Sequence, residues 1–307
     1  MWPYITLIVF VLVAAAVVLF ARIAERRHPP LGKFLSCGGA RLHYLEQGPA
    51  DGDVVVLLHG NGAMIYDFIL SGLVDRLSEK YRVIVFDRPG FGYSSRPRLR
   101  LWTPAAQAEL FEQALKQLGV ERPIVLGHSW GAMVAIALAL RDPSAVKGLV
   151  LASGFYFPTP RLDVWLLTGP AIPIIGDLMR YSISPLVSWL ILPKLLRNVF
   201  SPDPIPMKFE AEFPKNLTVR PGPLRAAAEE TAFMIPAASK LAKRYGELNC
   251  PVYVIAGDDD NVVESEQAVR LHKMLPRSVH VAMPGGHMIH HSHADRLVSS
   301  VDLINAW

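Results

Sequence analysis

The chain has 307 residues, a formal net charge of +4 and 51% apolar residues. This length exceeds an average domain and fits one large α/β domain that carries an insertion. The small net charge, without a long basic run or a basic stripe interleaved with aromatic residues, argues against nucleic-acid binding.

Residues 2–21 contain no charged side chain and form the first predicted element. A helix of this length, at about 1.5 Å per residue, reaches the roughly 30 Å of a bilayer core. We expect a retained transmembrane anchor, because no Lys or Arg precedes the run and no small-x-small cleavage site follows it. A cleaved signal peptide and a soluble apolar helix stay open as alternatives.

The charges that follow the apolar run set its expected orientation. Four basic residues oppose the single Glu25, namely Arg22, Arg26, Arg27 and Lys33. By the positive-inside rule, the globular part should face the cytoplasm and the short amino end should lie outside. With a cleaved signal peptide the globular part would instead be exported.

Six apolar runs follow a Pro-containing linker and predict buried strands. They are residues 53–60, 82–87, 122–129, 148–154, 251–260 and 279–286. Their continuous apolar character is typical of strands covered on both faces. Helical patterns at residues 69–80, 104–119 and 131–142 separate several of them, which predicts an α/β fold with a doubly wound, mostly parallel sheet. Residues 41–48 alternate between polar and apolar side chains and predict an antiparallel edge strand.

The strand and helix alternation stops for about ninety residues after the fourth of these strands. Residues 154–246 are rich in Pro and aromatic side chains at first and helical toward their end. Because this stretch is too long for a loop, we predict a helical cap inserted into the core, beyond the carboxyl ends of the strands where ligands bind. An extra packed lobe without a functional part is the alternative. The predicted domains are an anchor and linker at residues 1–30, a core at 31–153 and 247–307, and the cap at 154–246.

A Gly-x-Ser-x-Gly pattern lies between a predicted strand and a predicted helix. It runs from Gly127 through Ser129 to Gly131. A sharp strand-to-helix turn at such a place holds the Ser hydroxyl exposed, and side chains in place of the two glycines would collide there. The pattern therefore predicts a nucleophilic Ser129, against the plain alternative of a tight turn packed with glycine.

A Ser hydroxyl needs a base, which a carboxylate orients, and in this fold class the chain order is Ser, acid, His. His287 follows the last predicted strand on a Gly-Gly turn and is the expected base. We expect His290, His291 and His293 to lie on a solvated helix face. Their spacing would allow a metal site, but we expect no Cys or carboxylate to join them closely, which argues against one.

Three consecutive carboxylates, Asp258, Asp259 and Asp260, end the strand before His287. Calcium loops space their carboxylates alternately around a Gly, so this run does not predict a metal site. It offers three candidates for the acid that orients the base. The two cysteines, Cys37 and Cys250, are far apart in sequence, and we expect two buried thiols.

Two backbone N–H groups are expected to stabilise the oxyanion. One belongs to Trp130, the residue after the nucleophile. The second is expected from Asn61, which lies between Gly60 and Gly62 after the strand at residues 53–60. Flanking glycines let the backbone approach a ligand closely. The alternative is a plain glycine-rich turn without a role in the site, which would have the same sequence pattern.

Five motifs in this order resemble the α/β-hydrolase family, in particular its capped single-domain members. They are "LLHGNG", "VIVFDRPGFGYSS", "VLGHSWG", "VIAGDDDNVV" and "PGGHM", within residues 35–307. The resemblance implies that Ser129 is the nucleophile, that His287 is the general base and that the amides of Asn61 and Trp130 hold the oxyanion. The family pattern Gly-x-x-Asp-x-x-Val selects Asp260 as the acid, with Asp259 as the alternative if the turn is shifted by one residue. The resemblance also implies that Asp87 is part of a structural turn.

The resemblance separates some activities from others. Haloalkane dehalogenases and epoxide hydrolases of this fold carry Asp at the position of Ser129, which argues against both. Ester and thioester hydrolases, carbon-carbon bond hydrolases, haloperoxidase or perhydrolase types and Pro-specific aminopeptidases all use Ser. We expect a serine hydrolase without a cofactor. An acyltransferase and a non-catalytic, membrane-tethered binding module are alternatives, and the sequence does not indicate the oligomeric state.

The expected substrate is a small molecule with a hydrophobic acyl group. The expectation comes from the membrane anchor and from the aromatic residues of the cap. Those aromatic residues are Phe155, Tyr156, Phe157, Trp165 and Trp189. Aromatic side chains more often form the core of such a lobe than the wall of a pocket, so this expectation is a preference among the serine-dependent activities.

Overall fold

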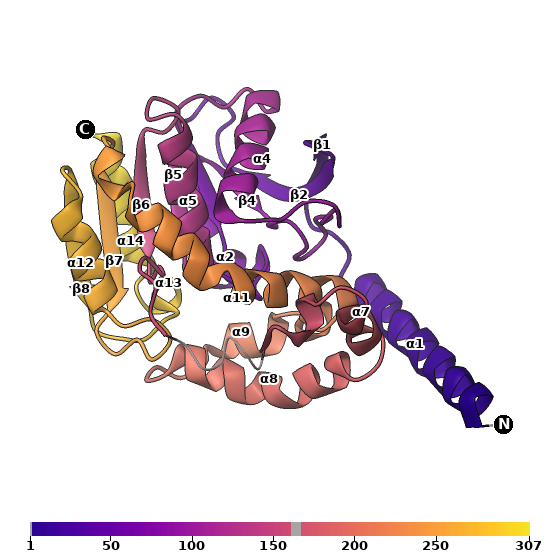
Figure 1. Ribbon diagram of the computed structural model, residues 1–307. Coiled ribbons are helices and arrows are strands. Elements are labelled where there is room, and N and C mark those ends of the chain that lie inside the picture. Colours follow the sequence, from indigo (N-terminus) through magenta and orange to yellow (C-terminus); the bar gives the residue numbers. More distant parts are fainter. Residues whose placement is uncertain (1, 161–166) are drawn as a thin grey trace.

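The structure is a computed structural model that describes residues 2–160 and 167–307, and an eight-stranded sheet lies at its centre (Figure 1). The strand order is β1-β2-β4-β3-β5-β6-β7-β8. The strands are β1 (Lys33–Cys37), β2 (Ala40–Gln47), β3 (Val54–Leu58), β4 (Arg82–Phe86), β5 (Ile124–His128), β6 (Gly148–Ala152), β7 (Val252–Gly257) and β8 (Ser278–Met283). Strands β3 to β8 pair in parallel, whereas β1 and β2 are antiparallel. The predicted mostly parallel sheet is therefore confirmed.

The antiparallel end of the sheet differs from the prediction in one respect. Strand β2 pairs with β4 as expected, but β1 pairs with its other side, so β1 forms the edge. Gly38 and Gly39 join the two strands with φ angles of 54° and 76°, which a two-residue hairpin turn of this hand requires. Strand β1 is short and mostly exposed, so it carries little of the apolar pattern that marks the other strands.

Helices cover both faces of the sheet. Helices α4 (Pro104–Gln117), α5 (Trp130–Arg141) and α12 (Glu266–Met274) pack on one face, and α3 (Leu73–Ser78) and α14 (Ala294–Asn305) pack on the other. Strands β5, β6 and β7 are buried along their whole length. This two-sided burial is the reason that their sequences are continuously apolar.

The predicted helix over residues 69–80 is in fact two helices. Helix α2 (Tyr66–Leu70) ends before Gly72, and α3 begins after it. Gly72 has a φ of 75°, which continues neither helix. The apolar spacing of the stretch predicted helical structure correctly, but a single Gly inside the pattern was the signal for the break.

Helices fill the described part of the chain between β6 and β7. They are η1 (Gly169–Ala171), α7 (Ile175–Arg180), α8 (Ser184–Phe200), α9 (Met207–Glu212), α10 (Lys215–Thr218), α11 (Pro221–Ala242) and η2 (Tyr245–Glu247). Figure 1 shows α11 crossing close to the sheet, with α8 on the side farther from it. Phe155, Tyr156 and Phe157 are buried in the main core, Trp189 is exposed, and Trp165 lies outside the described residues.

Helix α1 (Trp2–Arg27) extends away from the rest of the molecule (Figure 1). Its length and composition are sufficient to cross a membrane, a test that a signal sequence near the amino terminus also passes. The apolar side chains of its first five turns are exposed or only partly buried. Its last turns contact the domain, where Ala24 is buried and Glu25 forms a 2.6 Å ion pair with Arg220.

Candidate active site

Ser129 occupies a sharp turn between β5 and α5. Its φ and ψ are 54° and −118°, a strained conformation for a residue with a side chain. A Cβ atom at Gly127 would lie 2.5 Å from the Gly131 carbonyl oxygen, and one at Gly131 would lie 2.0 Å from the Leu58 carbonyl oxygen. Both glycines are therefore required sterically, the first across the turn and the second against the end of β3.

His287 lies on the loop after β8 and contacts the acidic run after β7. Its Nδ1 is 2.8 Å from Asp260 Oδ2, and both side chains are almost completely buried. The other carboxylate oxygen of Asp260 accepts hydrogen bonds from the backbone N–H groups of Val262 and Val263, at 2.8 and 2.9 Å. Asp258 and Asp259 are exposed. Of the three carboxylates, the structure brings Asp260 to the imidazole.

Ser129 and His287 are not hydrogen-bonded to each other in the structure. The loop of His287 is nevertheless held beside the turn of Ser129, because His128 Nε2 donates to the His287 carbonyl oxygen at 3.0 Å. The His128 and His287 rings lie 4.9 Å apart, centre to centre. Burial, followed by the neighbouring His290 and His287, holds the pKa of His128 well below its usual range, so His128 is neutral at physiological pH.

The backbone N–H groups of Asn61 and Trp130 have no hydrogen-bond partner among the residues that the structure describes. Trp130 is the first residue of α5, where the N–H groups are free of intrahelical bonds. Asn61 follows Gly60, and a Cβ atom at Gly60 would lie 3.2 Å from the Ser129 Cβ atom. The Asn61 side chain points to the cap, where Nδ2 donates to Ala227 and Thr231 of α11.

Arg88 fixes the loop that carries Asn61, and the sequence did not single it out. Its guanidinium donates to the carbonyl oxygens of His59 and Gly60, at 2.6 and 2.8 Å. The same group forms a bidentate pair with Glu230 of α11, at 2.5 and 2.9 Å, and both side chains are fully buried. Arg88 therefore ties the loop after β3 to the cap. Only the fold brings the two residues of this ion pair together, so no local pattern could predict it.

We expect Glu230→Gln to destabilise the protein by about 3–5 kcal/mol, because it leaves the buried Arg88 charge without its carboxylate. Urea unfolding at neutral pH measures this change. Glu247→Gln is the matched control, since Glu247 pairs with Arg244 at the surface and its loss should cost less than about 1 kcal/mol. Equal losses in the two variants would contradict the role of the Arg88 and Glu230 pair.

His59, at the end of β3, is held neutral by its surroundings. Its Nε2 accepts from the Arg88 backbone N–H at 2.9 Å, and its Nδ1 bonds the Gly60 carbonyl oxygen at 2.8 Å. Burial and the Arg88 charge lower the pKa of His59 to about 3. A second proton would have to sit on Nε2, opposite the Arg88 N–H, and would break the bond that positions the loop.

We predict a stability loss in acid that depends on His59. Because the pKa of His59 is lower in the folded state than in the unfolded chain, the unfolded chain binds the proton first as the pH falls. The free energy of unfolding should therefore decrease below about pH 6.5, with His59 contributing about 2 kcal/mol of loss between pH 8 and pH 5. In His59→Gln, whose amide oxygen can accept from Arg88, this contribution should vanish. Urea unfolding at a series of pH values measures this difference. If the free energy of unfolding falls equally with pH in the parent protein and in His59→Gln, the predicted role of His59 is wrong.

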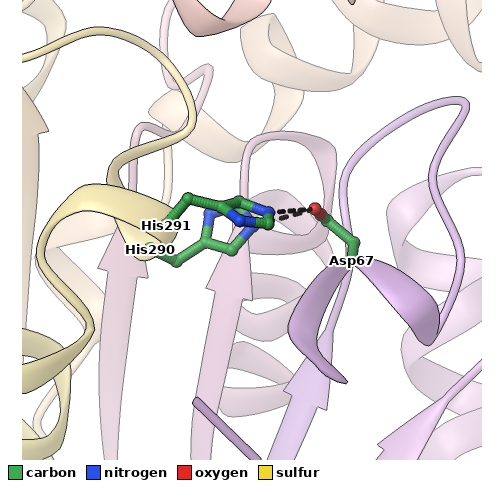
Figure 2. A group of neighbouring side chains, drawn as sticks. All are labelled: Asp67, His290 and His291. Carbon is green, nitrogen blue, oxygen red and sulfur yellow. Dashed lines mark hydrogen bonds and ion pairs between the residues drawn. The ribbon is translucent and has the colours of Figure 1, made fainter. Parts of the chain in front are cut away.

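Three further histidines, His290, His291 and His293, were expected on a solvated helix face, and for His290 and His291 this expectation is wrong. His290 and His291 lie in the short helix α13 (Ile289–Ser292), and the side chains of both are buried. Figure 2 shows both rings directed at Asp67 of α2; their Nε2 atoms lie 3.1 and 3.0 Å from the same oxygen, Oδ1. His293 bonds the Pro284 carbonyl oxygen at the surface. The histidines follow the loop of His287 in sequence, but their buried partner, Asp67, is more than two hundred residues away.

The Asp67, His290 and His291 cluster supports the site from behind. Burial opposes the charge on Asp67, but the His290 and His291 imidazoles outweigh this effect and hold the pKa of Asp67 well below its usual range. The His290 ring packs 4.4 Å from His128, centre to centre. The three ligand-type atoms lie within 4.8 Å of one another, so a carboxylate does join the histidines, contrary to expectation. His291 Nε2 is hydrogen-bonded to Asp67 Oδ1, whereas His290 Nε2 contacts the same oxygen at ion-pair distance without hydrogen-bond geometry. We interpret the cluster as a structural support for His128.

Known proteins resemble this chain in sequence and in structure. A family model described as the alpha/beta hydrolase fold matches residues 53–294. The magnesium-chelatase 30 kDa subunit of Rhodobacter capsulatus is 30% identical over 264 residues, 82% of this chain and 87% of that protein. The 2-hydroxymuconate semialdehyde hydrolase of Pseudomonas putida is 28% identical over 293 residues, 91% of this chain and 95% of that protein. The crystal structure of a membrane phospholipase A, a bacterial virulence factor, matches with a TM-score of 0.68 and 24% identity over the full length of both chains.

Proposed function

We propose that this chain, which belongs to the α/β-hydrolase family, is a serine hydrolase that cleaves an ester or thioester with a hydrophobic acyl group. Ser129 is the nucleophile, His287 the general base and Asp260 the acid of its triad. The amides of Asn61 and Trp130 form the oxyanion hole. The observation that carries the proposal is the 2.8 Å contact from His287 Nδ1 to Asp260 Oδ2, beside a strained Ser129 at the end of β5.

The first chemical step is acylation of Ser129. His287 Nε2 takes the hydroxyl proton while Oγ attacks the substrate carbonyl carbon. The free hydroxyl and imidazole are not hydrogen-bonded, as is common in apo sites whose bonds tighten only with substrate bound. Asp260 holds the Nδ1–H tautomer and stabilises the imidazolium that forms. The imidazolium then protonates the leaving alcohol or thiol.

The developing oxyanion is stabilised by two N–H groups that have no partner in the free protein. Arg88 and His59 position the Asn61 N–H, and the first turn of α5 positions the Trp130 N–H. In the second step His287 activates a water molecule, which attacks the acyl-enzyme and releases the acid. The same groups stabilise the second tetrahedral intermediate.

The membrane association of the enzyme is also a proposal. Helix α1 serves as a retained anchor, and the basic residues after its apolar run place the globular part on the cytoplasmic side. Such an anchor supports a substrate that partitions into or near lipid. The match to a membrane phospholipase A over its full length, α1 included, agrees with this arrangement.

A panel of esters and thioesters with acyl chains from acetyl to palmitoyl tests the substrate class. We expect kcat/KM to rise with chain length over at least part of the series. The likeness to 2-hydroxymuconate semialdehyde hydrolase makes carbon-carbon bond hydrolysis the second candidate, so the panel includes 2-hydroxymuconate semialdehyde. Turnover of the semialdehyde alone would replace the ester proposal. Transfer of the acyl group to an added alcohol in preference to water would indicate an acyltransferase.

A further inference from the structure

The cap carries exposed apolar side chains on its outer side, and no described part of the protein covers them. We define the apolar cap surface by Ile174, Leu178, Leu186, Val187, Leu190 and Ile191, each of which is exposed. Leu186 and Leu190 are 61% and 69% exposed. A soluble protein seldom leaves a contiguous apolar patch of this kind in water, and such patches mark sites of contact with a partner or a membrane.

The pattern of α8 directs these side chains outward. Leu186, Val187, Leu190 and Ile191 are spaced i, i+1, i+4 and i+5, which places them on one face of the helix. The opposite face contains the residues that are partly buried, and the ends of the helix are buried at Pro185 and Phe200. Helix α8 therefore presents an apolar face outward along its first two turns.

The loop that joins α7 to α8, and so connects the two parts of the apolar cap surface, lies near the last turns of α1. Tyr181, between α7 and α8, lines a cavity of about 550 Å³ together with Val18 and Arg22 of α1. Val18 belongs to the apolar run, and Arg22 is the first charged residue after it. The cavity therefore lies at the level along α1 where apolar side chains give way to charged ones. In a membrane-spanning helix this level is the boundary between acyl chains and headgroups.

Arginines surround the same cavity. Arg41, Arg96, Arg220 and Arg225 line it with Arg22, against the single acidic lining residue Glu25. Arg96 and Arg225 share Glu229, and Arg220 pairs with Glu25, whereas Arg22 and Arg41 are exposed. Exposed arginines at this level match the phosphate groups of a lipid surface in charge and in position.

From these observations we propose that the apolar cap surface is immersed in the interfacial layer of the bilayer that α1 crosses. The proposal rests on α1 being a retained membrane anchor. Figure 1 agrees with this arrangement, since α7 lies beside the point where α1 leaves the domain and α8 follows it in the chain. The cap then contacts the lipid from which a hydrophobic substrate would come, and the protein is fixed to the membrane at two places.

Quenching of tryptophan fluorescence tests the contact in the full chain reconstituted into phosphatidylcholine and phosphatidylglycerol vesicles. Trp189 lies in the first two turns of α8, beside the outward apolar face, and is 43% exposed, so it reports on the cap. The probe is lipid brominated in the upper part of its acyl chains. If the cap contacts the bilayer, the brominated lipid quenches Trp189. We therefore expect the fraction of the emission that this lipid quenches to be smaller in Trp189→Phe than in the parent protein. Trp307→Phe is the matched control, because Trp307 is exposed at the end of the chain beside Tyr253, away from the cap. This substitution should remove only emission that the brominated lipid does not quench.

Trp2 gives an independent reading of the anchor. Quenching that is lost in Trp2→Phe but not in Trp189→Phe would overturn the cap contact and leave the anchor intact. Quenching lost in neither variant would overturn both. In the double variant Leu186→Glu and Leu190→Glu, quenching of Trp189 should fall at least about twofold, because charged side chains leave the interfacial layer. Unchanged quenching in that variant, or burial of the cap surface by a second copy of the chain without quenching, would also contradict the proposal.

Discussion

Replacing Asp260 by Asn should lower kcat by about four orders of magnitude. An Asn amide cannot stabilise the imidazolium of His287 and favours the wrong imidazole tautomer, although it fills the same space and retains one acceptor for the Val262 and Val263 N–H groups. Steady-state kinetics on the best ester of the panel measures the effect. Circular dichroism and urea unfolding establish that the variant is folded.

The neighbouring carboxylates provide the controls for this prediction. Asp258 and Asp259 are exposed, so Asp258→Asn and Asp259→Asn should each leave kcat within about twofold of the parent value. A large loss in Asp259→Asn with full activity in Asp260→Asn would mean that the turn is shifted by one residue in the working enzyme. The three variants make the same chemical change, Asp to Asn, at three consecutive positions. A difference in their activity therefore reports on the position of the carboxylate and not on the type of substitution.

Replacing Ser129 by Ala should reduce kcat by roughly four to six orders of magnitude. The substitution removes the atom that forms the acyl-enzyme, while the oxyanion amides and the substrate contacts stay. Alanine also has a side chain at a φ of 54°, so the strain of the turn is kept and the fold should be unchanged. We expect KM to change little when acylation limits the rate. Single-turnover measurements with a chromogenic ester determine the residual rate.

The sequence predicted the sheet and the nucleophile turn because both depend on local patterns. Continuous apolar runs follow from two-sided burial, and the elbow needs glycines on both sides of Ser129. The approach of Asp260 to His287 was predicted through the spacing of a family motif. In the structure this contact depends on the parallel pairing of β7 with β8, which brings their carboxyl ends together.

The supporting contacts behind the site could not be predicted, because they join segments far apart in the chain. Asp67 and His290 come from helices that are far apart in the sequence. The sequence around His290 therefore gives no sign of the buried carboxylate that it contacts. A run of histidines after the base resembles a polar helix start, which is why a solvated face was expected. The presence of Asp67 in the apolar stretch "IYDFIL" was the available signal, since a lone acid there needs a buried partner.

The same limit applies to the contact between core and cap. Arg88 follows β4, and Glu230 lies in the middle of α11, so only the inserted helices bring them together. Each residue alone reads as an ordinary surface charge. Edge strand β1 and the break at Gly72 were missed for a different reason, since short exposed or interrupted elements carry little periodicity.

Labelling by a fluorophosphonate most directly tests whether Ser129 is an activated nucleophile. The full-length protein in vesicles is treated with the probe and digested, and mass spectrometry locates the modified residue. We predict a single labelled peptide with the adduct on Ser129, rapid labelling of the parent protein, slow labelling of Asp260→Asn and none of Ser129→Ala. If the intact parent protein is not labelled, or if Ser129→Ala is labelled equally, the protein is not the serine hydrolase proposed here.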